Sequence, residues 1–556
     1  MNRRSFRTKN ILNRHSLVYI TIMCFVLLAV FLILGNVGRI VRSANLDGGK
    51  GDPEVVNAAL EEGTAELMNE KIITLPEDAP EVSESFAGGN GNLKVSLWGE
   101  DKLLDSLASQ MMIMGQSYDR IESLENLEGV DVLVAASENI GEEELESIEG
   151  FVENGGSLWL ACLTRSLALD ESAAQLMGIT GCGPLKTWPG IRFSGDISGG
   201  YVRENPEYKV SALDITLDNR VKLYASALPE NYKEIDNEDL PPLIWRYVAT
   251  ENGGRVYVTN GDFMDTEVLY YMIPVIMSEL QDNYMYGVVN ACCVFVEGFP
   301  YAQNEERDSW MRLYSRDKMA IAQDLISSQY LRYYTSYGAR ISYFSGDYVQ
   351  LINNEDINLR YYTDTIESSM ALLALQDEKG LFLESSDEKL DIKDWEKGFS
   401  FTEGGNYCLP VNFEYTIENN EEQNFVMLSS AMGLGYYCFL NDVDKLLDYD
   451  GEADIWDEYC KNQEVVFGMC RQLCGWLERV TASQALERLA NLLNSDTRIT
   501  YGTDGSVNVK TDAEKAWFIL RGKYKNIEIE GGSAEEIGER CWLIEVEGGS
   551  AFIRCR

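Results

Sequence analysis

The chain has 556 residues, of which 45% are hydrophobic and 11% aromatic, so it is long enough for several globular domains with packed cores. Its 90 acidic residues outnumber its 47 basic residues, which gives a formal net charge of −43. This balance excludes an ordinary nucleic-acid-binding protein, because binding to the phosphate backbone needs a basic surface. Two interpretations of the acidity stay open: solubility through charge repulsion, or attraction to a cationic polymer such as a partly deacetylated amino-sugar chain.

The N-terminal region contains an uncharged apolar run, Leu17–Leu34, close to the length that spans a bilayer. The residues before it include several Arg and Lys but no acidic residue, which predicts that the N-terminus stays in the cytoplasm. A cleaved signal peptide is the alternative, but the run is long for one and no clear small-residue cleavage site follows it. We therefore expect a cytoplasmic tail over residues 1–16, a transmembrane helix over 17–35, and the bulk of the chain outside the cell membrane.

The next segment, residues 36–91, is rich in Gly, Pro and acidic residues and is predicted to be a stalk or linker. From residue 92 an α/β pattern begins. Short β-rich runs occur at 93–99, 129–136 and 157–163. Between the last two of these runs, apolar residues recur at helical spacing, and alternating strands and helices predict a parallel sheet. Two more strands, joined by a Gly253–Gly254 turn, are expected to return to the same sheet.

Residues 92–285 resemble the class I glutamine amidotransferase-like, flavodoxin-like fold. The resemblance is carried by "VDVLVAA", "FVENGGSLWLACL" and "GGRVYVTNGDF". Active members of that superfamily carry a G-x-C-x-G nucleophile elbow and a histidine, but Cys162 stands in "LACLT" without the flanking glycines. We therefore expect Cys162 to be a small buried apolar residue and this domain to be non-catalytic.

The histidine and cysteine content limits the chemistry further. The single histidine, His15, precedes the predicted membrane span, so no imidazole is present beyond it to act as metal ligand or general base. Of the 12 cysteines, Cys24 lies in the apolar run, and the odd number that follows cannot all pair within one chain. Cys470 and Cys474, one helical turn apart, indicate a buried helix face. A bridge between Cys541 and Cys555 across two C-terminal strands is one option.

A second α/β series begins at residue 286 with "NACCVFVEGFP", in which a buried-looking strand ends at Glu297. Further helices are expected at 316–336, 362–375 and 457–493, and further strands within 339–349, 407–415 and 429–447. The last residues, 497–556, show short alternating runs separated by Gly or Asp, which predict a small β-sandwich.

Residues 286–492 resemble the polysaccharide deacetylase (NodB-homology) barrel, through "VFVEGFP", "ISYFSGDY", "GYYCFLNDVDKLL" and "GWLERVTASQALERL". The whole chain resembles a family of membrane-anchored bacterial proteins that join an amidotransferase-like domain to such a barrel and occur with Pel-type exopolysaccharide genes. The expected fold class is therefore α/β: an N-terminal transmembrane helix, a flavodoxin-like domain, a deacetylase-like (β/α) barrel and a small C-terminal β-sandwich.

The resemblance implies where a deacetylase site would lie. Active relatives are expected to bind a divalent metal through one carboxylate of an Asp-Asp pair and two histidines, and the metal-bound water attacks the N-acetyl carbonyl. In this chain Glu297–Gly298 stands at the Asp-Asp position, and Leu440 and Asn441 replace a histidine ligand and its neighbour. We therefore expect no metal, no cofactor and no deacetylase activity, that is, a pseudoenzyme.

Several acidic and aromatic residues nevertheless lie near predicted strand ends, which in a barrel face the mouth of the active site. The candidate glycan-groove residues are Glu297, Asp347, Glu414, Asp442, Phe299 and Tyr343. Two carboxylates suffice for glycoside hydrolysis. A carboxylate-only glycoside hydrolase acting on an exopolysaccharide is therefore an alternative to a groove that only binds. A purely structural barrel that serves assembly with membrane partners is a further alternative.

The sequence as a whole predicts a non-catalytic, extracytoplasmic subunit of Pel-like exopolysaccharide biosynthesis or export, anchored in the membrane by a single span. Its expected partners are the membrane, the exopolysaccharide and membrane-bound synthase or export subunits. A ligand-sensing ectodomain is a further alternative, weakened by a cytoplasmic tail too short for an output domain.

Overall fold

The computed structural model describes residues 93–344, 407–447 and 455–556 apart from short gaps, together with strands at 382–383 and 400–401. The predicted tail, transmembrane helix and stalk (1–91) lie outside the described residues, as does the helix expected at 362–375. No helix in the described part is both long enough and apolar enough to cross a membrane.

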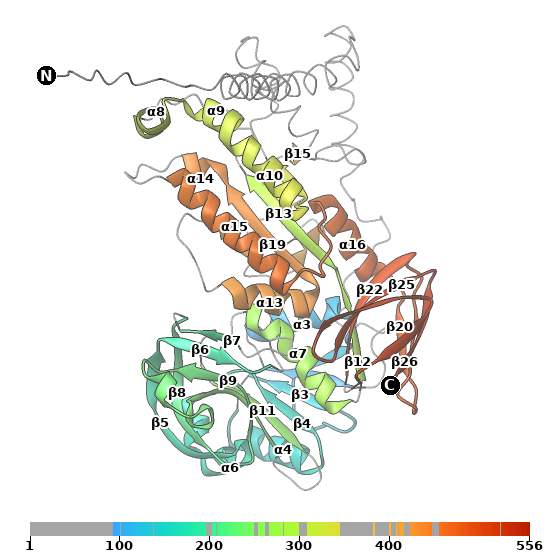
Figure 1. Ribbon diagram of the computed structural model, residues 1–556. Helices are drawn as coiled ribbons and strands as arrows, with labels where there is room; N and C mark the ends of the chain where they lie inside the picture. The colour runs from blue at the N-terminus through green and yellow to red at the C-terminus, as the bar shows by residue number, and fades with distance from the viewer. Residues whose placement is uncertain are drawn as a thin grey trace, which may run out of the picture. The chain divides into compact units, whose positions relative to one another are not determined.

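The first folded part contains a nine-stranded sheet in the order β2-β1-β3-β4-β11-β10-β9-β6-β7 (Figure 1). Its strands are β1 (Val95–Trp98), β2 (Tyr118–Ile121), β3 (Val132–Ala135), β4 (Ser157–Leu160), β6 (Gly190–Phe193), β7 (Arg203–Asn205), β9 (Lys222–Leu228), β10 (Pro242–Val248) and β11 (Arg255–Thr259). The strands from β2 to β11 in this order run parallel, as the alternating sequence pattern predicts. The order of these five strands is that of flavodoxin-like sheets.

Antiparallel strands complete this sheet. Strands β10 and β11 are the pair expected around the Gly253–Gly254 turn, and they lie in the same sheet. Beyond them, β9, β6 and β7 pair antiparallel. A separate two-stranded ribbon is formed by β5 (Ile179–Trp188) and β8 (Val210–Leu217). The sequence patterns did not predict the strands between residues 179 and 228.

The helices of this part are α3 (Lys102–Ile113), α4 (Glu142–Glu153), α5 (Arg165–Leu169), α6 (Glu171–Met177) and α7 (Thr266–Leu280). Helix α4 begins where the Gly141 amide donates a hydrogen bond to the Glu144 side chain, 3.0 Å away. Its residues Ile148 and Val152 are buried, in agreement with the helical spacing of the sequence. The helix stops at Asn154, and Gly155 follows with φ +97°, a conformation that glycine adopts without strain.

The second part contains a five-stranded sheet in the order β15-β14-β13-β19-β18, in which all neighbours are parallel. Its strands are β13 (Ala291–Glu297), β14 (Ile341–Phe344), β15 (Phe382–Leu383), β18 (Phe413–Tyr415) and β19 (Tyr436–Asp442). A short antiparallel pair, β16 (Ser400–Phe401) and β17 (Tyr407–Cys408), accompanies it. The two edge strands, β15 and β18, do not pair in the described residues, so closure of this sheet into a barrel stays a prediction.

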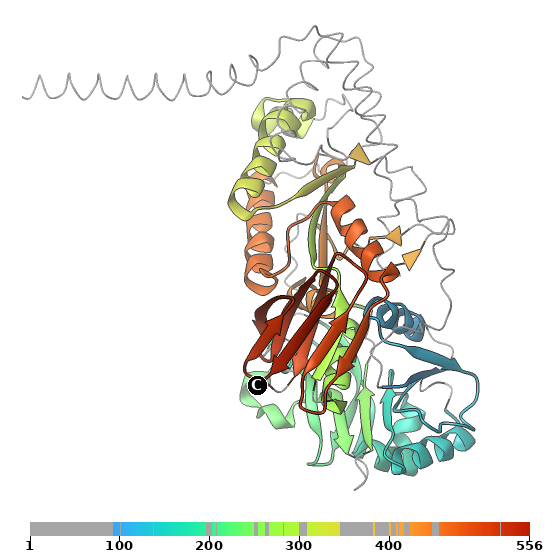
Figure 2. The ribbon, with the colours of Figure 1, turned by 90° about the vertical axis from the view of Figure 1, so that its right-hand side faces the viewer.

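Helices cover both faces of the five-stranded sheet. They are α8 (Asp308–Tyr314), α9 (Lys318–Ile321), a π-helical turn (Ala322–Ile326), α10 (Ser327–Tyr337), α13 (Gln423–Leu434), α14 (Val443–Leu447), α15 (Ile455–Leu473) and α16 (Ala482–Asn494). Along β13, Cys292 and Val294 pack on the side of α10 and α15, whereas Cys293 and Phe295 pack on the side of α16. The two side views show these helices on opposite sides of the strands (Figures 1 and 2).

The structure refines two expectations for this part. A strand was expected within 429–447, and it forms at 436–442; residues 429–434 end helix α13, and 443–447 form helix α14. The long helical region 457–493 is two helices, because α15 stops at Leu473 and α16 starts afresh at Ala482. A capping box starts α16: the Thr481 amide donates to the Gln484 side chain at 3.1 Å, and the Gln484 amide donates to the Thr481 hydroxyl at 3.5 Å.

The C-terminal part consists of two four-stranded antiparallel sheets around one core, the arrangement of a small β-sandwich. One sheet contains β20 (Arg498–Tyr501), β21 (Val507–Lys510), β26 (Ser550–Cys555) and β23 (Ile527–Glu530). The other contains β12 (Asn283–Val288), β22 (Lys515–Gly522), β25 (Cys541–Glu547) and β24 (Gly532–Gly538). Because β12 precedes the five-stranded sheet in sequence, the domain boundary expected between residues 285 and 286 falls inside a strand of the sandwich.

The structure contains no bridge between Cys541 and Cys555, which lie in different sheets of the sandwich. Cys541 is buried with its sulfur 3.7 Å from the Tyr271 hydroxyl of α7. Cys555 lies in the other sheet and packs against the interior of the sandwich.

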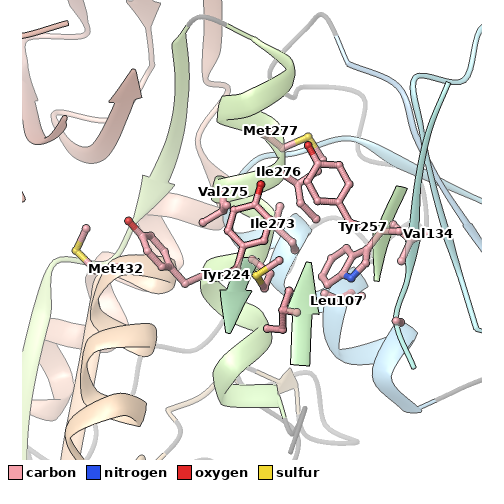
Figure 3. Close-up of a cluster of buried hydrophobic side chains, with 14 of the residues drawn as sticks. Leu107, Val134, Tyr224, Tyr257, Ile273, Val275, Ile276, Met277 and Met432 are labelled. Atoms are coloured by element: carbon pink, nitrogen blue, oxygen red, sulfur yellow. The ribbon is translucent and has the colours of Figure 1, made fainter. Parts of the chain in front are cut away.

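One hydrophobic core joins residues of all three parts, and α7 is central to it. Ile273 and Val275 of this helix belong to one cluster with Tyr224 and Tyr257 of the nine-stranded sheet and Met432 of α13 (Figure 3). Trp517, Ile519 and Leu543 of the sandwich belong to the same core. The three parts therefore share buried apolar surface rather than being separated by exposed linkers.

Candidate functional site

The predicted site residues come from neighbouring strands of the five-stranded sheet. Glu297, the last residue of β13, is in register with Asp442, the last residue of β19. One residue earlier in the strand, Val296 of β13 is in register with Tyr343 of β14 and Asn441 of β19. Since neighbouring strands lie about 4.8 Å apart, the two acidic residues end adjacent strands at the same level.

Glu414 lies in β18, which pairs with β19 on the side opposite to β13. Because Glu414 is in register with Leu440, it lies two residues before the level of Asp442. The strand positions of Glu297, Glu414 and Tyr343 are described, but their side chains are not. Asp347 lies wholly outside the described residues. The carboxyl edge of β13, β19 and β18 therefore collects three of the predicted acidic residues by strand register.

The carboxylate of Asp442 already has a structural partner. Its Oδ1 accepts a hydrogen bond from the Lys445 amide at 3.0 Å, so Asp442 is the N-cap of helix α14. Its Oδ2 lies 3.5 Å from Lys445 Nζ, and its side chain is 13% exposed. An Asp followed by "VDKLL" is a signal for the start of a helix, although from the sequence this Asp was interpreted only as the end of a strand.

The position next to it, Asn441, belongs to the core. Asn441 is 1% exposed and its Oδ1 accepts a hydrogen bond from Gln463 Nε2 of α15. Leu440, at the position of a ligand in the resemblance, is 6% exposed and packs on the α16 side. Both positions therefore hold core side chains. The buried amide of Asn441 needs an internal hydrogen-bond partner, and Gln463 supplies it.

Phe299 occupies a core position as well. Its side chain is fully buried and meets the ring of Tyr330 from α10 edge to face, with ring centroids 5.7 Å apart. This edge-to-face arrangement is a favoured packing of aromatic rings. A ring at this position does not offer a face for sugar stacking, so its location does not support that role.

A second charged cluster consists of residues that no sequence motif connects. Glu279, near the C-terminus of α7, lies 2.6 Å from Lys222 Nζ of β9 and 2.7 Å from Arg246 Nη1 of β10. The Tyr257 hydroxyl of β11 donates to the same carboxylate at 3.2 Å. Burial raises the pKa of Glu279, but hydrogen bonds from Lys222 and Tyr224 and the charges of its cationic partners outweigh burial, so the pKa is lowered.

The Glu279 carboxylate is paired internally and fastens α7 to three strands, so we assign it a structural role. No sequence signal could have found it, because its members are scattered over four elements and only the fold brings them together.

Cys162, which the sequence pattern compares with a nucleophile elbow, lies shortly after strand β4 of the nine-stranded sheet. The residue is half-buried, whereas a buried residue was expected from the sequence. In the described part of the chain, no three His, Cys, Asp or Glu side chains gather in a way that could hold a metal ion.

Comparison with known proteins gives remote similarities only. No family model and no curated protein matches the chain. Among solved structures, the cold-adapted β-galactosidase of Rahnella sp. R3 matches with a TM-score of 0.26 and 14% identity, over 34% of this chain and 31% of that one. This chain therefore spans about a third of that β-galactosidase.

Two further matches are named as deacetylases. Agd3, a carbohydrate deacetylase, matches with a TM-score of 0.39 and 10% identity, over 83% of this chain and 98% of its own. A putative glycoside hydrolase/deacetylase from Parabacteroides distasonis matches with a TM-score of 0.21 and 10% identity, over 42% and 80% of the two chains. With TM-scores below 0.5, these similarities assign neither a fold nor a function to this chain.

Proposed function

We propose that the carboxyl edge of the five-stranded sheet, around Glu297 of β13 and Asp442 of β19, binds a glycan without transforming it. The observation that carries the proposal is the register of these two strands, which ends both of them in an acidic residue at the same level. Binding sites of parallel α/β sheets lie at the carboxyl ends of their strands.

The charge of the protein favours a cationic ligand. The formal net charge is −43, and the edge of the sheet adds the acidic positions of β13, β19 and β18. Carboxylates accept hydrogen bonds from sugar hydroxyls and pair with ammonium groups. A partly deacetylated amino-sugar polymer offers both kinds of donor, so we propose this class of glycan as the ligand.

The non-catalytic role rests on the residues that a metal-dependent deacetylase would need. The chain contains one histidine, His15, far from this edge in the sequence. Asn441 and Leu440 are packed in the core, and one oxygen of Asp442 caps α14. We therefore propose a glycan-binding subunit of an exopolysaccharide synthesis or export system. The apolar run at 17–34 would anchor it to the membrane, with the folded parts outside the cell.

A glycoside hydrolase is the second candidate, and the same register favours it. A retaining glycosidase needs two carboxyl groups about 5–5.5 Å apart. The backbones of adjacent strands are about 4.8 Å apart, which is comparable to this separation, and Glu297 and Asp442 end two such strands. The two candidates differ in whether the bound polymer is cut.

The test uses the full-length chain in detergent and oligomers of glucosamine at low salt, with the fully N-acetylated oligomers as comparison. We expect calorimetry to show tighter binding of the deacetylated oligomers. We further expect Glu297→Gln and Asp442→Asn each to weaken binding about tenfold or more. Asn retains the ability to cap α14, so Asp442→Asn removes the charge and keeps the helix start. Glu146→Gln, on the exposed surface of α4, is the matched control.

Unchanged binding in both variants would refute this location of the site. Release of new reducing ends by the wild-type chain, lost in Glu297→Gln, would instead identify the hydrolase. Metal-dependent release of acetate from the N-acetylated oligomers would overturn the non-catalytic assignment.

A further inference from the structure

Two buried cysteine thiols that are far apart in the sequence lie next to each other, between strand β13 and helix α15. Cys292 lies in β13 and Cys470 in α15, and each is 1% exposed. Their sulfur atoms are 3.4 Å apart, although 178 positions separate them along the chain. A disulfide requires the sulfurs to approach to about 2.05 Å. The two sulfurs are already in van der Waals contact, and bond formation brings them about 1.4 Å closer.

The backbone around Cys292 holds the pair in place. The Cys292 amide donates to the Glu478 carbonyl at 2.8 Å, and the Val480 amide donates to the Cys292 carbonyl at 3.2 Å. These bonds tie β13 directly to the segment that follows α15. The two thiols are therefore brought together by a fixed connection between β13 and the segment after α15.

The neighbouring cysteines are directed elsewhere. Cys293 lies on the opposite face of β13, in the core on the α16 side, with Cys438 in register beside it. Cys474 follows α15 one turn after Cys470, and its sulfur faces the Met427 carbonyl at 3.9 Å. Of these thiols, Cys470 is the one in contact with Cys292.

The surroundings also favour thiol chemistry at Cys292. The hydrogen bond with Cys470 and the positive charge of Arg479 lower the pKa of Cys292 to about 7, although burial acts in the opposite direction. The pKa of Cys470 is raised, by that hydrogen bond and by burial. A thiolate is the nucleophile of disulfide exchange, and in the folded pair Cys292 is the thiol that is deprotonated more easily.

We propose that Cys292 and Cys470 are oxidised to a disulfide that covalently fastens β13 to α15. The oxidant is a disulfide of a small thiol or of a thiol–disulfide oxidoreductase. The thiolate of one of the two cysteines attacks a sulfur of this disulfide, forms a mixed disulfide and releases the first thiol of the donor. The thiolate of the other cysteine then attacks the protein sulfur of the mixed disulfide and releases the second thiol of the donor. The protein loses two protons and two electrons, and the donor disulfide is reduced to two thiols.

The burial of both sulfurs sets the timing of this step. In the folded protein an oxidant cannot reach them, so exchange takes place during folding, before α15 closes over β13. The same burial protects the finished bond from reductants. Such a bond persists in an oxidising compartment, and it is independent of whether the sheet edge binds a glycan.

The test starts from the full-length chain purified from membranes without reductant, denatured in the presence of an alkylating agent, and digested for mass spectrometry. We expect a peptide pair linked through Cys292 and Cys470, with neither residue alkylated. Cys474→Ala is the matched control, because it removes a buried thiol at the end of the same helix and leaves the linked pair intact. Cys470→Ala abolishes the link.

Thermal unfolding gives a second measurement. Reduction under mildly denaturing conditions is expected to lower the apparent Tm of the wild-type chain and of Cys474→Ala by several degrees, because the bond closes a very long loop. Cys470→Ala is expected to show no response to reductant. Recovery of both Cys292 and Cys470 in alkylated form, or of either residue linked to another cysteine, would overturn the proposal.

Discussion

Glu279 illustrates at the residue scale how this protein keeps a charge in its interior. The side chain is 14% exposed and is paired with Lys222 and Arg246, whose side chains are 36% and 23% exposed. A buried carboxylate is costly unless it is paired and hydrogen-bonded, and breaking such a pair leaves the partner charge uncompensated. The lowered pKa of Glu279 is the electrostatic signature of this pairing.

Replacement of this carboxylate should therefore destabilise the protein in a pH-dependent way. We expect Glu279→Gln to lower the free energy of unfolding by about 1–3 kcal/mol at pH 7, a range that allows for the partial exposure of its partners. Because the folded pKa lies below the ordinary value of 4.5, the contribution is present above that pH and is lost as pH falls through the folded value. Urea midpoints at pH 7 and pH 3 measure this, and the difference from wild type should shrink at pH 3.

Glu146→Gln is the control for this prediction, since Glu146 is exposed on α4. A deficit of Glu279→Gln that is equal at both pH values would mean that the charge does not contribute and that packing alone is affected.

At the scale of elements, the break between α15 and α16 shows how local signals divide a helical sequence. The apolar spacing continues through 457–493, but the chain leaves the helix after Leu473 and starts a new one at Ala482. The reciprocal hydrogen bonds of Thr481 and Gln484 satisfy amides that the first turn of α16 would otherwise leave without partners. This restart directs α16 to the opposite face of the sheet from α15.

Loss of the cap should weaken α16 measurably. We expect Thr481→Ala to lower the free energy of unfolding by about 1 kcal/mol, because the Gln484 amide loses its acceptor. Thr481→Ser retains a hydroxyl and should stay within a few tenths of a kcal/mol of wild type. Chemical denaturation of the full chain followed by circular dichroism measures both variants. Equal effects of Ala and Ser would show that the methyl group of Thr481, and not the cap, is what matters.

At the scale of the whole molecule, segments distant in sequence complete one another. Strand β12 is a fully buried member of the C-terminal sandwich, although more than 200 residues separate it from its partner β22. The Tyr286 hydroxyl of β12 donates to the Met432 carbonyl at 2.5 Å. This carbonyl is one of the last four of α13, which have no partner within the helix. The sandwich, α13 and α7 are therefore built around a shared interior.

The sandwich should consequently depend on β12 for its stability. We expect a fragment of residues 497–556 to lack a cooperative thermal transition, because the edge of β22 and part of the core around Met285 are left open. The same fragment preceded by residues 281–290 through a flexible linker should recover such a transition. Circular dichroism of both fragments measures the difference, and a cooperative transition of the shorter fragment at the same temperature would contradict the expectation.

Sequence-based prediction succeeded in this chain where an element depends on residues that are close together in the sequence. Helix α4 was predicted because its apolar residues recur at helical spacing within a few residues of each other. Strands β13 and β19 were predicted as continuous apolar runs, which parallel strands covered on both faces require. The strands between 179 and 228 lack a strong alternating pattern, so their existence could not be derived locally.

The candidate site was predicted in part. The acidic ends of β13 and β19 were recognised from the sequence, but their mutual register was not, since strand pairing depends on contacts across more than 100 residues. The roles of Asp442 as a helix cap and of Phe299 as a core residue depend on which elements lie next to them. The meeting of Cys292 and Cys470 depends on the same long-range packing.

The sequence by itself determined the acidity of the protein, the near absence of histidine and the α/β alternation, because composition and periodicity are properties of the chain. The tertiary structure alone decided that β12 completes the C-terminal sandwich, that Glu279 is held by three strands, and that Glu297 and Asp442 end adjacent strands. Each of these features depends on which distant segments bury their apolar surfaces against each other. A local sequence pattern does not contain that information.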